Sequence, residues 1–296
     1  MGKISIVIPL YNKEKSIKNT ILKVLEQTYH DFELIIVNDG STDKSFDVVC
    51  AIKDKRIRII NKNNGGVSSA RNLGIKEARY DIIAFLDADD IWDTDYLENL
   101  VNMVEKYPLA VMYAQAYNYV LNEKTYVIQN EYLKGNELVL VNNYNKYILK
   151  TPFVWTSAVA INKKYIEQSG LFDETLSLGE DTDMWFRLAM CGPIVYSPAI
   201  KAHYMMVHSG TTKINLSGKR SKHIAFKAVT KYKKEYKDNK FLKGIVNTFI
   251  LHGYILYLKY GEYEDAKFYR KELDMWNLSI RDMVKYFYYQ LISIIK

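Results

Sequence analysis

The 296-residue chain has few cysteines, few histidines and no long apolar segment. Its two cysteines, Cys50 and Cys191, fall in unrelated helical patterns, so we expect reduced structural thiols rather than a disulfide framework. No stretch reaches the roughly 18 apolar residues that a membrane span requires, and the first residues read as a core strand without a signal-peptide pattern. We therefore expect a protein that is made and kept in the cytoplasm.

The positive charge of the chain is concentrated in its C-terminal part. The net charge is +7, but residues 210–296 contain 18 Lys or Arg against 8 Asp or Glu, whereas residues 1–209 contain 23 against 26. With 48% hydrophobic and 25% charged residues, the composition is that of an ordinary globular protein. The sequence therefore predicts one large, nearly neutral α/β domain followed by a basic appendage.

Short apolar segments alternate with amphipathic segments through the first 90 residues. This alternation predicts right-handed βαβ units, which build a parallel sheet with helices on its faces. The expected strands cover residues 4–9, 32–37, 57–60 and 82–86, and the expected helices cover residues 13–27, 46–52 and 67–78. Ligands of such sheets bind beyond the carboxyl ends of the strands. Asn12, Asp39, the Gly65-Gly66 turn and Asp87 all fall there, which predicts a single binding crevice.

Three carboxylates, Asp87, Asp89 and Asp90, follow the apolar segment Ile82–Leu86. In an extended backbone the i and i+2 spacing places Asp87 and Asp89 on the same side. Carboxylate oxygens are hard ligands that suit Mg²⁺ or Mn²⁺ carrying phosphate oxygens. The cluster can also be explained without a metal, as acidic residues that favour the start of a following helix near residues 93–95.

Five motifs together resemble family 2 glycosyltransferases, which are inverting enzymes of the GT-A fold that use a nucleotide sugar. The motifs are Ser5–Asn12 (SIVIPLYN), Val37–Asp43 (VNDGSTD), Asn64–Asn72 (NGGVSSARN), Leu86–Asp90 (LDADD) and Gly179–Asp183 (GEDTD). The resemblance implies a Rossmann-like, mostly parallel sheet flanked by helices. It covers roughly the first 210 residues, so we expect a catalytic domain over residues 1–210 and a basic, Tyr-rich helical extension over residues 211–296.

The resemblance also implies how the crevice binds its donor, for which a UDP-sugar is expected. The Asp39 carboxylate would accept a hydrogen bond from uracil, and a Mn²⁺ or Mg²⁺ ion on Asp87 and Asp89 would stabilise the diphosphate leaving group. Arg71 would meet phosphate together with helix amides. Asp39 can otherwise be explained by turn chemistry, and Arg71 by a salt bridge on an exposed helix face. The implied donor-binding residues are Pro9, Tyr11, Asn12, Glu14, Asp39, Asn64, Gly66, Arg71, Asp87 and Ala88.

An acceptor hydroxyl must lose its proton when it attacks the sugar, and three acidic residues are candidates for the base. Glu180, Asp181 and Asp183 open an amphipathic helix, where acids also stabilise the helix dipole. The resemblance implies that Asp181 is the general base of an inverting single displacement, with Asp183 and Glu180 as the nearest substitutes.

Several further residues are candidates by resemblance to the acceptor and metal sites of the family. His208 would add a metal ligand, and His203 is a weaker candidate because an isolated histidine is more often structural. An apolar strand is expected over residues 151–161 on the acceptor side. Trp155 and Trp185 could stack on a sugar face there, although a tryptophan is more often part of the core.

The basic tail permits two interpretations. Residues 213–243 hold most of the excess charge, and residues 241–260 and 283–295 are apolar and Tyr-rich. Such helices suit an anionic membrane surface, where a lipid-linked acceptor would be found, and would place the protein peripherally on the inner face of the cytoplasmic membrane. They also suit a helical hairpin packed on the catalytic domain. Nucleic acid is not an expected partner, because no known binding motif accompanies the charge.

The sequence thus predicts a metal-dependent, inverting transferase that moves a sugar to a glycan or lipid-linked oligosaccharide in surface polysaccharide biosynthesis. A sugar nucleotidyltransferase would instead carry a Gly-rich loop with a basic residue just after the first strand, where this chain has Pro9–Lys13. A catalytically silent sugar-binding subunit is the remaining alternative, and intact Asp87, Asp89 and Asp181 argue against it.

Overall fold

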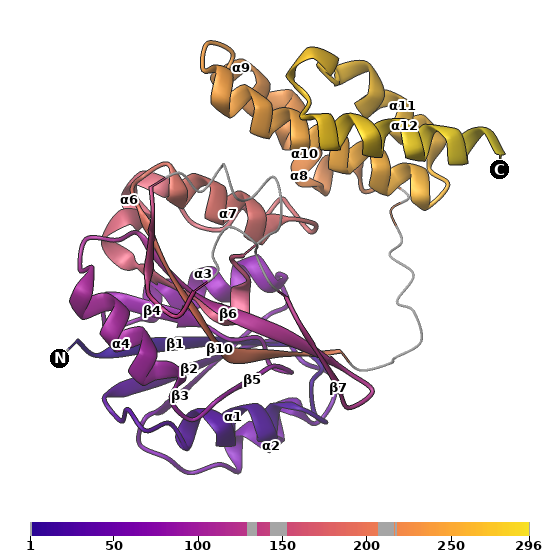
Figure 1. The fold of residues 1–296 in the computed structure, drawn as a ribbon. Coiled ribbons are helices and arrows are strands. Elements are labelled where there is room, and N and C mark those ends of the chain that lie inside the picture. Colours follow the sequence, from indigo (N-terminus) through magenta and orange to yellow (C-terminus); the bar gives the residue numbers. More distant parts are fainter. Residues whose placement is uncertain (1, 129–134, 143–152, 207–215, 217, 296) are drawn as a thin grey trace. The chain divides into compact units, whose positions relative to one another are not determined.

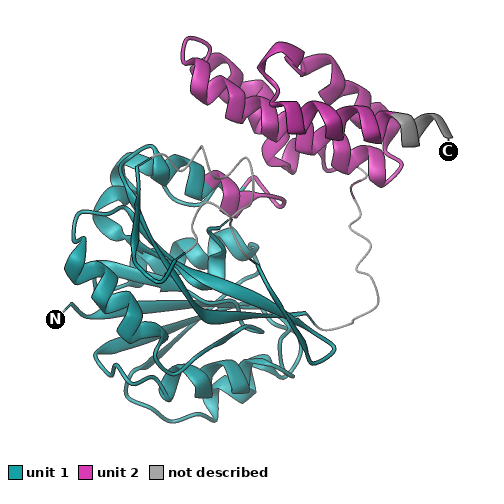
Figure 2. Cartoon of the chain, in the orientation of Figure 1, with its two compact units in different colours: residues 1–174, 184–210 teal, residues 175–183, 211–296 magenta. Residues whose placement is uncertain are grey.

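The computed structural model describes residues 2–128, 135–142, 153–206, 216 and 218–295. The chain divides into two compact units (Figure 2). The first consists of residues 1–174 and 184–210, and the second of residues 175–183 and 211–296.

The first unit is built on a mixed sheet whose N-terminal half is parallel (Figure 1). Its parallel strands are β1 (Ile4–Leu10), β2 (Phe32–Asp39), β3 (Ile57–Lys62) and β4 (Ile82–Phe85). β1 pairs with β2 on one side and with β4 on the other, and β3 follows β2. The chain therefore builds outward from β1 to β3 and then crosses to the opposite side of β1. The predicted mostly parallel α/β sheet is confirmed, and its strand order reverses between β1 and β4.

The other half of the sheet mixes directions and uses strands from distant parts of the chain. It contains β9 (Val159–Asn162), β6 (Met112–Leu121), β10 (Ile194–Met206) and β5 (Ile91–Trp92), with β7 (Lys124–Val127) paired to β6 and β8 (Val139–Val141) paired to β10. The strand expected over residues 151–161 is wrong for residues 153–158, and residues 151 and 152 lie outside the described part. Thr156–Ala158 form a 3-10 turn, in which the Ser157 hydroxyl bonds to Asp87 and Asp90 of the loop after β4.

Helices cover both faces of the sheet, and their apolar spacing explains where they lie. The helices of this unit are α1 (Ile17–Leu25), α2 (Ser45–Cys50), α3 (Val67–Glu77), α4 (Tyr96–Lys106), η2 (Lys163–Tyr165) and α6 (Ile166–Ser169). α1 buries Ile17, Ile21 and Val24 in one core cluster with α4 and alternate residues of β1. α3 packs against the other face, where a Cβ on Gly74 would lie 2.3 Å from Val7. Cys50 and Cys191 are both free, as predicted.

The second unit is a helical bundle arranged around one long, apolar helix. Its elements are η3 (Arg220–Lys222), α8 (Ile224–Lys227), the π-helical turn η4 (Ala228–Tyr232), α9 (Lys233–Glu235), α10 (Lys240–Lys259), α11 (Tyr263–Glu272), η5 (Met275–Asn277) and α12 (Ile280–Ile295). The expectation that no segment is long and apolar enough to cross a membrane is corrected by α10, which alone among the described residues meets both requirements. However, 61% of its apolar window is buried inside the protein. That burial is typical of the core helix of a bundle.

His223 stabilises the start of α8 as a buried, neutral side chain. Its Nδ1 accepts a hydrogen bond of 3.1 Å from the Ala225 amide, and the rings of Tyr257 and Tyr269 lie edge-on to it. Burial, together with the nearby charge of His252, lowers the pKa of His223 from 6.5 to about 4. The imidazole can therefore act as an acceptor for the helix over the whole neutral range.

We expect the protein to lose stability as the pH falls from 6.5 to about 4, because His223 resists protonation in the folded chain. In this window the unfolded chain binds a proton at His223 that the folded chain excludes, so the free energy of unfolding falls as the pH is lowered, by about 3 kcal/mol in full. His223→Asn keeps an acceptor for the Ala225 amide but does not titrate. Urea unfolding at a series of pH values should give a flatter profile for this variant, and equal slopes would contradict the assignment.

Candidate active site

A cavity of about 390 Å³ opens at the carboxyl edge of the sheet, at the point where the strand order reverses. The end of β2 and the loops that follow β1, β3 and β4 all contribute to it, together with the start of α3. Its lining residues are Pro9, Leu10, Tyr11, Lys13, Asp39, Asn64, Gly66, Val67, Ala70, Arg71, Asp87, Ala88 and Asp89. Most of the residues predicted to bind the donor are therefore gathered in one place, as expected for the edge of a parallel sheet.

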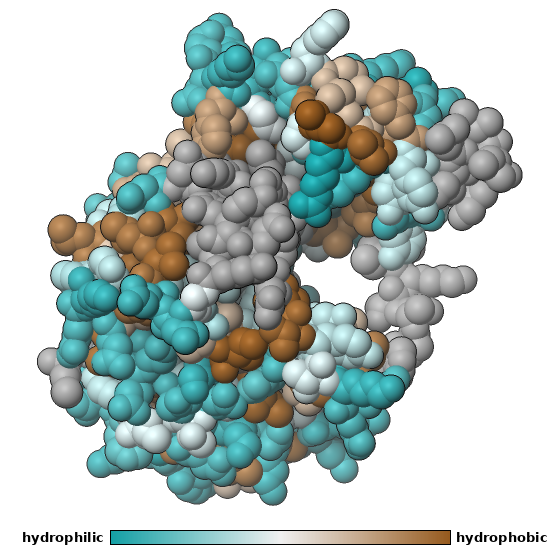
Figure 3. Space-filling model, viewed as in Figure 1, coloured by the Kyte–Doolittle hydropathy of each residue, from teal (hydrophilic) through white to brown (hydrophobic). Residues whose placement is uncertain are grey.

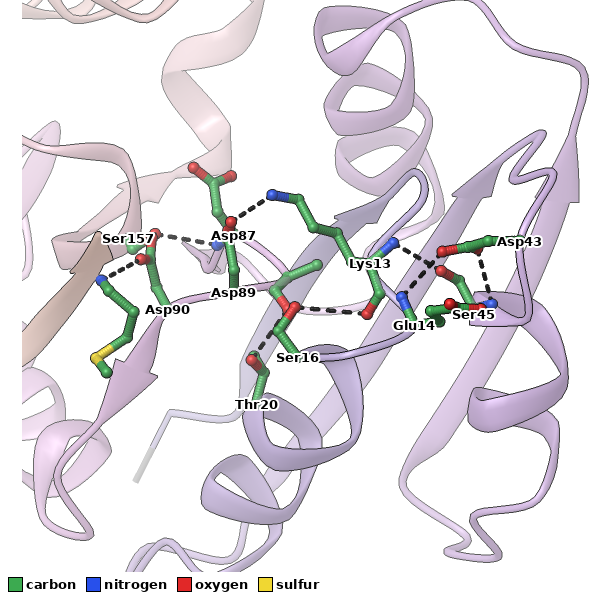
Figure 4. Close-up of polar contacts among 12 residues, drawn as sticks. Lys13, Glu14, Ser16, Thr20, Asp43, Ser45, Asp87, Asp89, Asp90 and Ser157 are labelled. Atoms are coloured by element: carbon green, nitrogen blue, oxygen red, sulfur yellow. Dashed lines mark hydrogen bonds and ion pairs between the residues drawn. The ribbon is translucent and has the colours of Figure 1, made fainter. Parts of the chain in front are cut away.

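The loop after β4 is held on three sides, which fixes Asp87 and Asp89 at the cavity (Figure 4). The Asp87 amide donates a 3.0 Å hydrogen bond to Ser157 Oγ, and Thr20 Oγ1 donates a 3.1 Å bond to the Ala88 carbonyl. The Leu86 amide also bonds to the Val7 carbonyl of β1 at 3.1 Å. These contacts come from segments far apart in the sequence, so three separate elements fix the position of the loop.

Asp90 is the structural member of the acidic cluster. It is almost fully buried, and it accepts hydrogen bonds from Ser157 Oγ at 2.6 Å and from the Met205 amide at 3.1 Å. Burial, with the charges of Asp87 and Asp89 adding to it, raises the pKa of Asp90 to about 8. The cluster is not explained by capping, because α4 begins only at Tyr96.

Two basic residues balance the carboxylates at the cavity. Arg71 Nη2 lies 2.8 Å from Asp87 Oδ1, and its guanidinium packs over the Phe172 ring at 5.5 Å. Arg71 is 4% exposed, so the alternative of a salt bridge on an exposed helix face is wrong. Lys13 Nζ pairs with Asp89 (Figure 4). No role at the site was predicted for Lys13, although its position directly after β1 and Asn12 marks it as a residue of this edge.

The two carboxylates at the cavity fit a divalent cation that is bound together with phosphate oxygens. Among the described residues no group of three or more His, Cys, Asp or Glu is arranged to hold a metal. Asp87 and Asp89 nevertheless both line the cavity, and Mg²⁺ is commonly bound by one or two carboxylates while substrate phosphates and waters complete its shell. Two carboxylates opposite a space for phosphate oxygens satisfy that requirement.

Asp39 connects the end of β2 to the start of α3. Its carboxylate accepts hydrogen bonds from the amides of Gly65 at 2.9 Å and Gly66 at 2.8 Å, and it pairs with Lys62. Gly66 has a φ of +89°, which favours glycine, and α3 begins at the next residue. The alternative of chemistry within Asp39's own turn is insufficient, since these partners lie more than 20 residues away. Asp39 orients the N-terminus of α3 and still lines the cavity.

Asn12 and Glu14 hold a neighbouring turn and are not among the cavity-lining residues. Asn12 Oδ1 accepts a 2.8 Å hydrogen bond from the Thr42 amide, and Glu14 Oε2 accepts a 2.9 Å bond from the Lys44 amide. In the structure both side chains support this turn, and their contact with the donor stays a prediction. Tyr11, which is about half exposed, does line the cavity.

The predicted base lies at the start of α7 (Glu180–Ala189), in the part that belongs to the second unit. Asp181 is partly exposed, and its Oδ1 accepts a 2.6 Å hydrogen bond from the Thr182 amide. Glu180 is also partly exposed. Gly179, with a φ of +78°, precedes them, and a Cβ there would lie 2.7 Å from Ile224.

Asp183 is not available as the substitute base that the sequence suggested. Its side chain is fully buried, lies 2.8 Å from Lys227 Nζ and accepts a hydrogen bond from the Tyr232 hydroxyl. A carboxylate enclosed in this way cannot reach an acceptor hydroxyl. The same contacts attach the first turn of α7 to α8 and to η4, so Asp183 has a positioning role.

The predicted acceptor-side tryptophans differ sharply in exposure. Trp185 is 1% exposed and packs between Phe85 and Phe172, so its predicted role in stacking on a sugar is contradicted by its burial in the core. Trp155 is only partly buried and lies 4.7 Å from the ring of Tyr117 and 5.2 Å from that of Tyr204. Trp155 also packs against the core cluster, so its stacking on a sugar stays a prediction.

Of the two candidate histidines, only His203 lies in the described part of the chain. His203 Nε2 lies 2.8 Å from Asp93 Oδ1, and its Nδ1 lies 2.8 Å from Asn118 Oδ1, which is the arrangement of a structural residue. His208 lies outside the described residues.

Comparison with known proteins gives concordant results for sequence and fold. The profile of glycosyl transferase family 2 matches residues 5–170. The Escherichia coli UDP-Glc:alpha-D-GlcNAc-diphosphoundecaprenol beta-1,3-glucosyltransferase WfaP is 32% identical over 219 residues, which cover 73% of this chain and 81% of WfaP. The uncharacterized glycosyltransferase EpsJ of Bacillus subtilis is 34% identical over 60% of this chain. The chain spans 54% of EpsJ and 33% of a similar Rickettsia felis protein.

A solved structure shares the fold. The crystal structure of Staphylococcus aureus TarS 1–349 in complex with UDP-GlcNAc superposes with a TM-score of 0.69, covering 89% of this chain and 78% of TarS 1–349. The sequence identity is 18%, so this likeness concerns the fold alone.

Proposed function

Because this chain belongs to glycosyl transferase family 2 and has the GT-A fold, we propose that it transfers a sugar from a UDP-sugar to a glycan or lipid-linked acceptor, with inversion. The resemblance inferred from the five motifs is confirmed, and the nucleotidyltransferase and silent-subunit alternatives are set aside. The observation that carries the proposal is the cavity itself, which combines Asp39, Arg71, Asp87, Asp89 and the start of α3 at the reversal point of the sheet.

The groups around the cavity suit a nucleoside diphosphate. Arg71 and the N-terminal amides of α3 offer positive charge and donors to phosphate oxygens. The Asp39 carboxylate can accept one more hydrogen bond on its remaining lone pairs, which suits the N3–H of uracil. A divalent cation held by Asp87 and Asp89 would supply Lewis acidity that stabilises the departing diphosphate. Lys13, which pairs with Asp89, adds further positive charge on the same side.

The acceptor hydroxyl requires a base, and we assign this role to Asp181. The carboxylate of Asp181 would remove the hydroxyl proton as the oxygen attacks the anomeric carbon opposite the diphosphate. Its partial exposure leaves an oxygen accessible, whereas Asp183 is enclosed. Trp155 offers an aromatic face for an acceptor sugar.

The relatives and the charge of the second unit support a proposal for the acceptor and the location. WfaP is named for a diphosphoundecaprenol-linked acceptor, and we extend a lipid-linked acceptor of surface polysaccharide biosynthesis to this chain. Residues 211–296 carry 18 Lys or Arg against 8 Asp or Glu, a balance that favours an anionic membrane surface. We therefore assign the protein a peripheral position on that surface.

The donor site is tested by calorimetric titration of UDP with and without Mn²⁺. We expect Mn²⁺ to tighten binding to the wild-type protein, and Asp89→Ala to weaken UDP binding in Mn²⁺ at least about tenfold, because one of the two carboxylate ligands is lost. Asp95→Ala is the control, because it removes a carboxylate that pairs with Lys201 outside the cavity. This variant should bind UDP in Mn²⁺ with the wild-type affinity. Unchanged UDP affinity of Asp89→Ala in Mn²⁺ would overturn the metal assignment and transfer the phosphate contact to Lys13 and Arg71.

A further inference from the structure

α12 exposes a continuous apolar face. Ile280, Val284, Phe287 and Tyr288 are each more than half exposed, and their i, i+4, i+7 and i+8 spacing places them on one side of the helix. Trp276, just before the helix, is 98% exposed. In the space-filling view, hydrophobic surface lies beside hydrophilic surface on the C-terminal helices (Figure 3). A surface of this kind normally marks an interaction site.

The opposite face of α12 is anchored within its own unit. Tyr286 is buried, its ring lies 5.4 Å from that of Tyr254 in α10, and its hydroxyl accepts a 3.1 Å hydrogen bond from Arg270 Nε of α11. The helix is therefore oriented by its buried side. The apolar face points away from the bundle because the other side is occupied.

The charge around this face indicates whether it binds a second copy of the chain or an anionic surface. Arg281 and Lys285 follow the apolar face at its edge, at about 100° per residue around the helix. Asp282, the only acidic residue of the sequence from 276 to 296, is buried. A second copy of this strongly basic unit would be repelled, whereas an anionic surface would attract it. An apolar face edged by basic residues, with an aromatic side chain at its start, is the pattern of a helix that lies in a membrane interface.

We propose that the α12 face, defined as Trp276, Ile280, Val284, Phe287 and Tyr288, inserts into the interface of an anionic lipid bilayer. The inference deepens the proposed function, since it rests on the membrane location assigned there and names the surface responsible. Insertion adds apolar burial to the electrostatic attraction of the lysines elsewhere in the unit. Binding should therefore persist in part at 1 M salt, where the Debye length is only about 3 Å.

The tryptophan itself provides the first test. Trp92 and Trp185 are both 1% exposed, but Trp155 is partly exposed, so the measurement uses a Trp155→Phe chain, in which a lipid-induced change in emission will come mainly from Trp276. With vesicles of phosphatidylglycerol and phosphatidylcholine brominated on their acyl chains, we expect a blue shift and quenching. Both should be lost in Trp276→Phe, which retains an apolar ring and should still bind. Binding without quenching would show that the α12 face stays outside the bilayer and would overturn the proposal.

Paired substitutions test the face without changing charge. Ile280→Gln combined with Phe287→Gln should lower vesicle co-sedimentation at least about tenfold. The matched control is Leu109→Gln combined with Val127→Gln, which alters two comparably exposed apolar side chains of the other unit and should leave binding unchanged. Equal losses in both pairs would contradict the proposal. So would a concentration-dependent dimer in sedimentation velocity that only the Ile280/Phe287 pair abolishes, since the partner would then be a second copy.

The proposed donor site and the proposed lipid-binding face can be refuted independently of each other. UDP titration reports the cavity of the first unit, which contains none of the α12 residues. Normal UDP binding with no vesicle binding would overturn the lipid face alone, whereas vesicle binding without any UDP binding would overturn the donor site.

Discussion

Asp181→Asn is expected to lower the turnover number by about 100-fold or more while leaving the affinity for UDP close to that of the wild-type protein. Asparagine keeps the shape of the side chain and an oxygen that can accept the 2.6 Å hydrogen bond from the Thr182 amide. It cannot take the proton of an acceptor hydroxyl, and general-base catalysis contributes about 10²- to 10⁴-fold to such reactions. Initial rates with a soluble acceptor give the turnover number, and UDP titration gives the affinity.

Glu180→Gln is the matched control for this experiment. It removes the carboxylate of the adjacent residue, which is also partly exposed, and we expect it to retain most of the activity. A nearly normal rate for Asp181→Asn combined with a large loss for Glu180→Gln would move the role by one residue. Nearly normal rates for both would remove the start of α7 from the chemistry.

The N-terminal half of the sheet could be predicted because its signals are local. Strands such as β2 are buried along their whole length and appear as uninterrupted apolar segments. The connections between them are short and follow the handedness of βαβ units, so the carboxyl ends of β1, β2 and β4 had to share an edge. This is why Asp39, Gly66 and Asp87 were placed correctly in one cavity before the fold was known, although Asn12, which was expected with them, does not line it.

The other half of the sheet depends on pairings that have no local signal. β9 lies between β4 and β6, and β10 pairs in parallel with β6 across about 80 residues of sequence. The turn at Ser157 exists because its hydroxyl meets Asp90 and the Asp87 amide, partners about 70 residues away. An apolar pattern alone could only suggest a strand there.

The same contrast between local signals and tertiary packing applies to individual side chains of the site. A motif identifies a residue type at a strand end, but only the packing shows whether that side chain faces the cavity. Asn12 bonds to a neighbouring turn, whereas Lys13, the next residue, faces Asp89. Trp185 has the aromatic surface that a sugar requires, but its helix directs it into the core beside Phe85.

The buried contact between Asp183 and Lys227 gives the second large expected effect. Lys227→Met should destabilise the protein by about 3–5 kcal/mol, because it leaves the fully buried Asp183 carboxylate without its cation. Adding Asp183→Asn should recover part of this loss, since the amide carries no charge and can still accept from the Tyr232 hydroxyl. Urea unfolding of the two single variants and the double variant measures the coupling.

The same variants should affect catalysis without affecting donor binding. Asp183 attaches the first turn of α7 to α8, and Asp181 lies in that turn, so losing the contact should displace the base and lower the turnover number. UDP affinity should not change, because neither Asp183 nor Lys227 lines the cavity. Lys234→Met removes an exposed lysine of α9 and should change neither stability nor rate. A Lys227→Met protein that is destabilised but turns over normally below its melting temperature would leave Asp183 with a purely structural role.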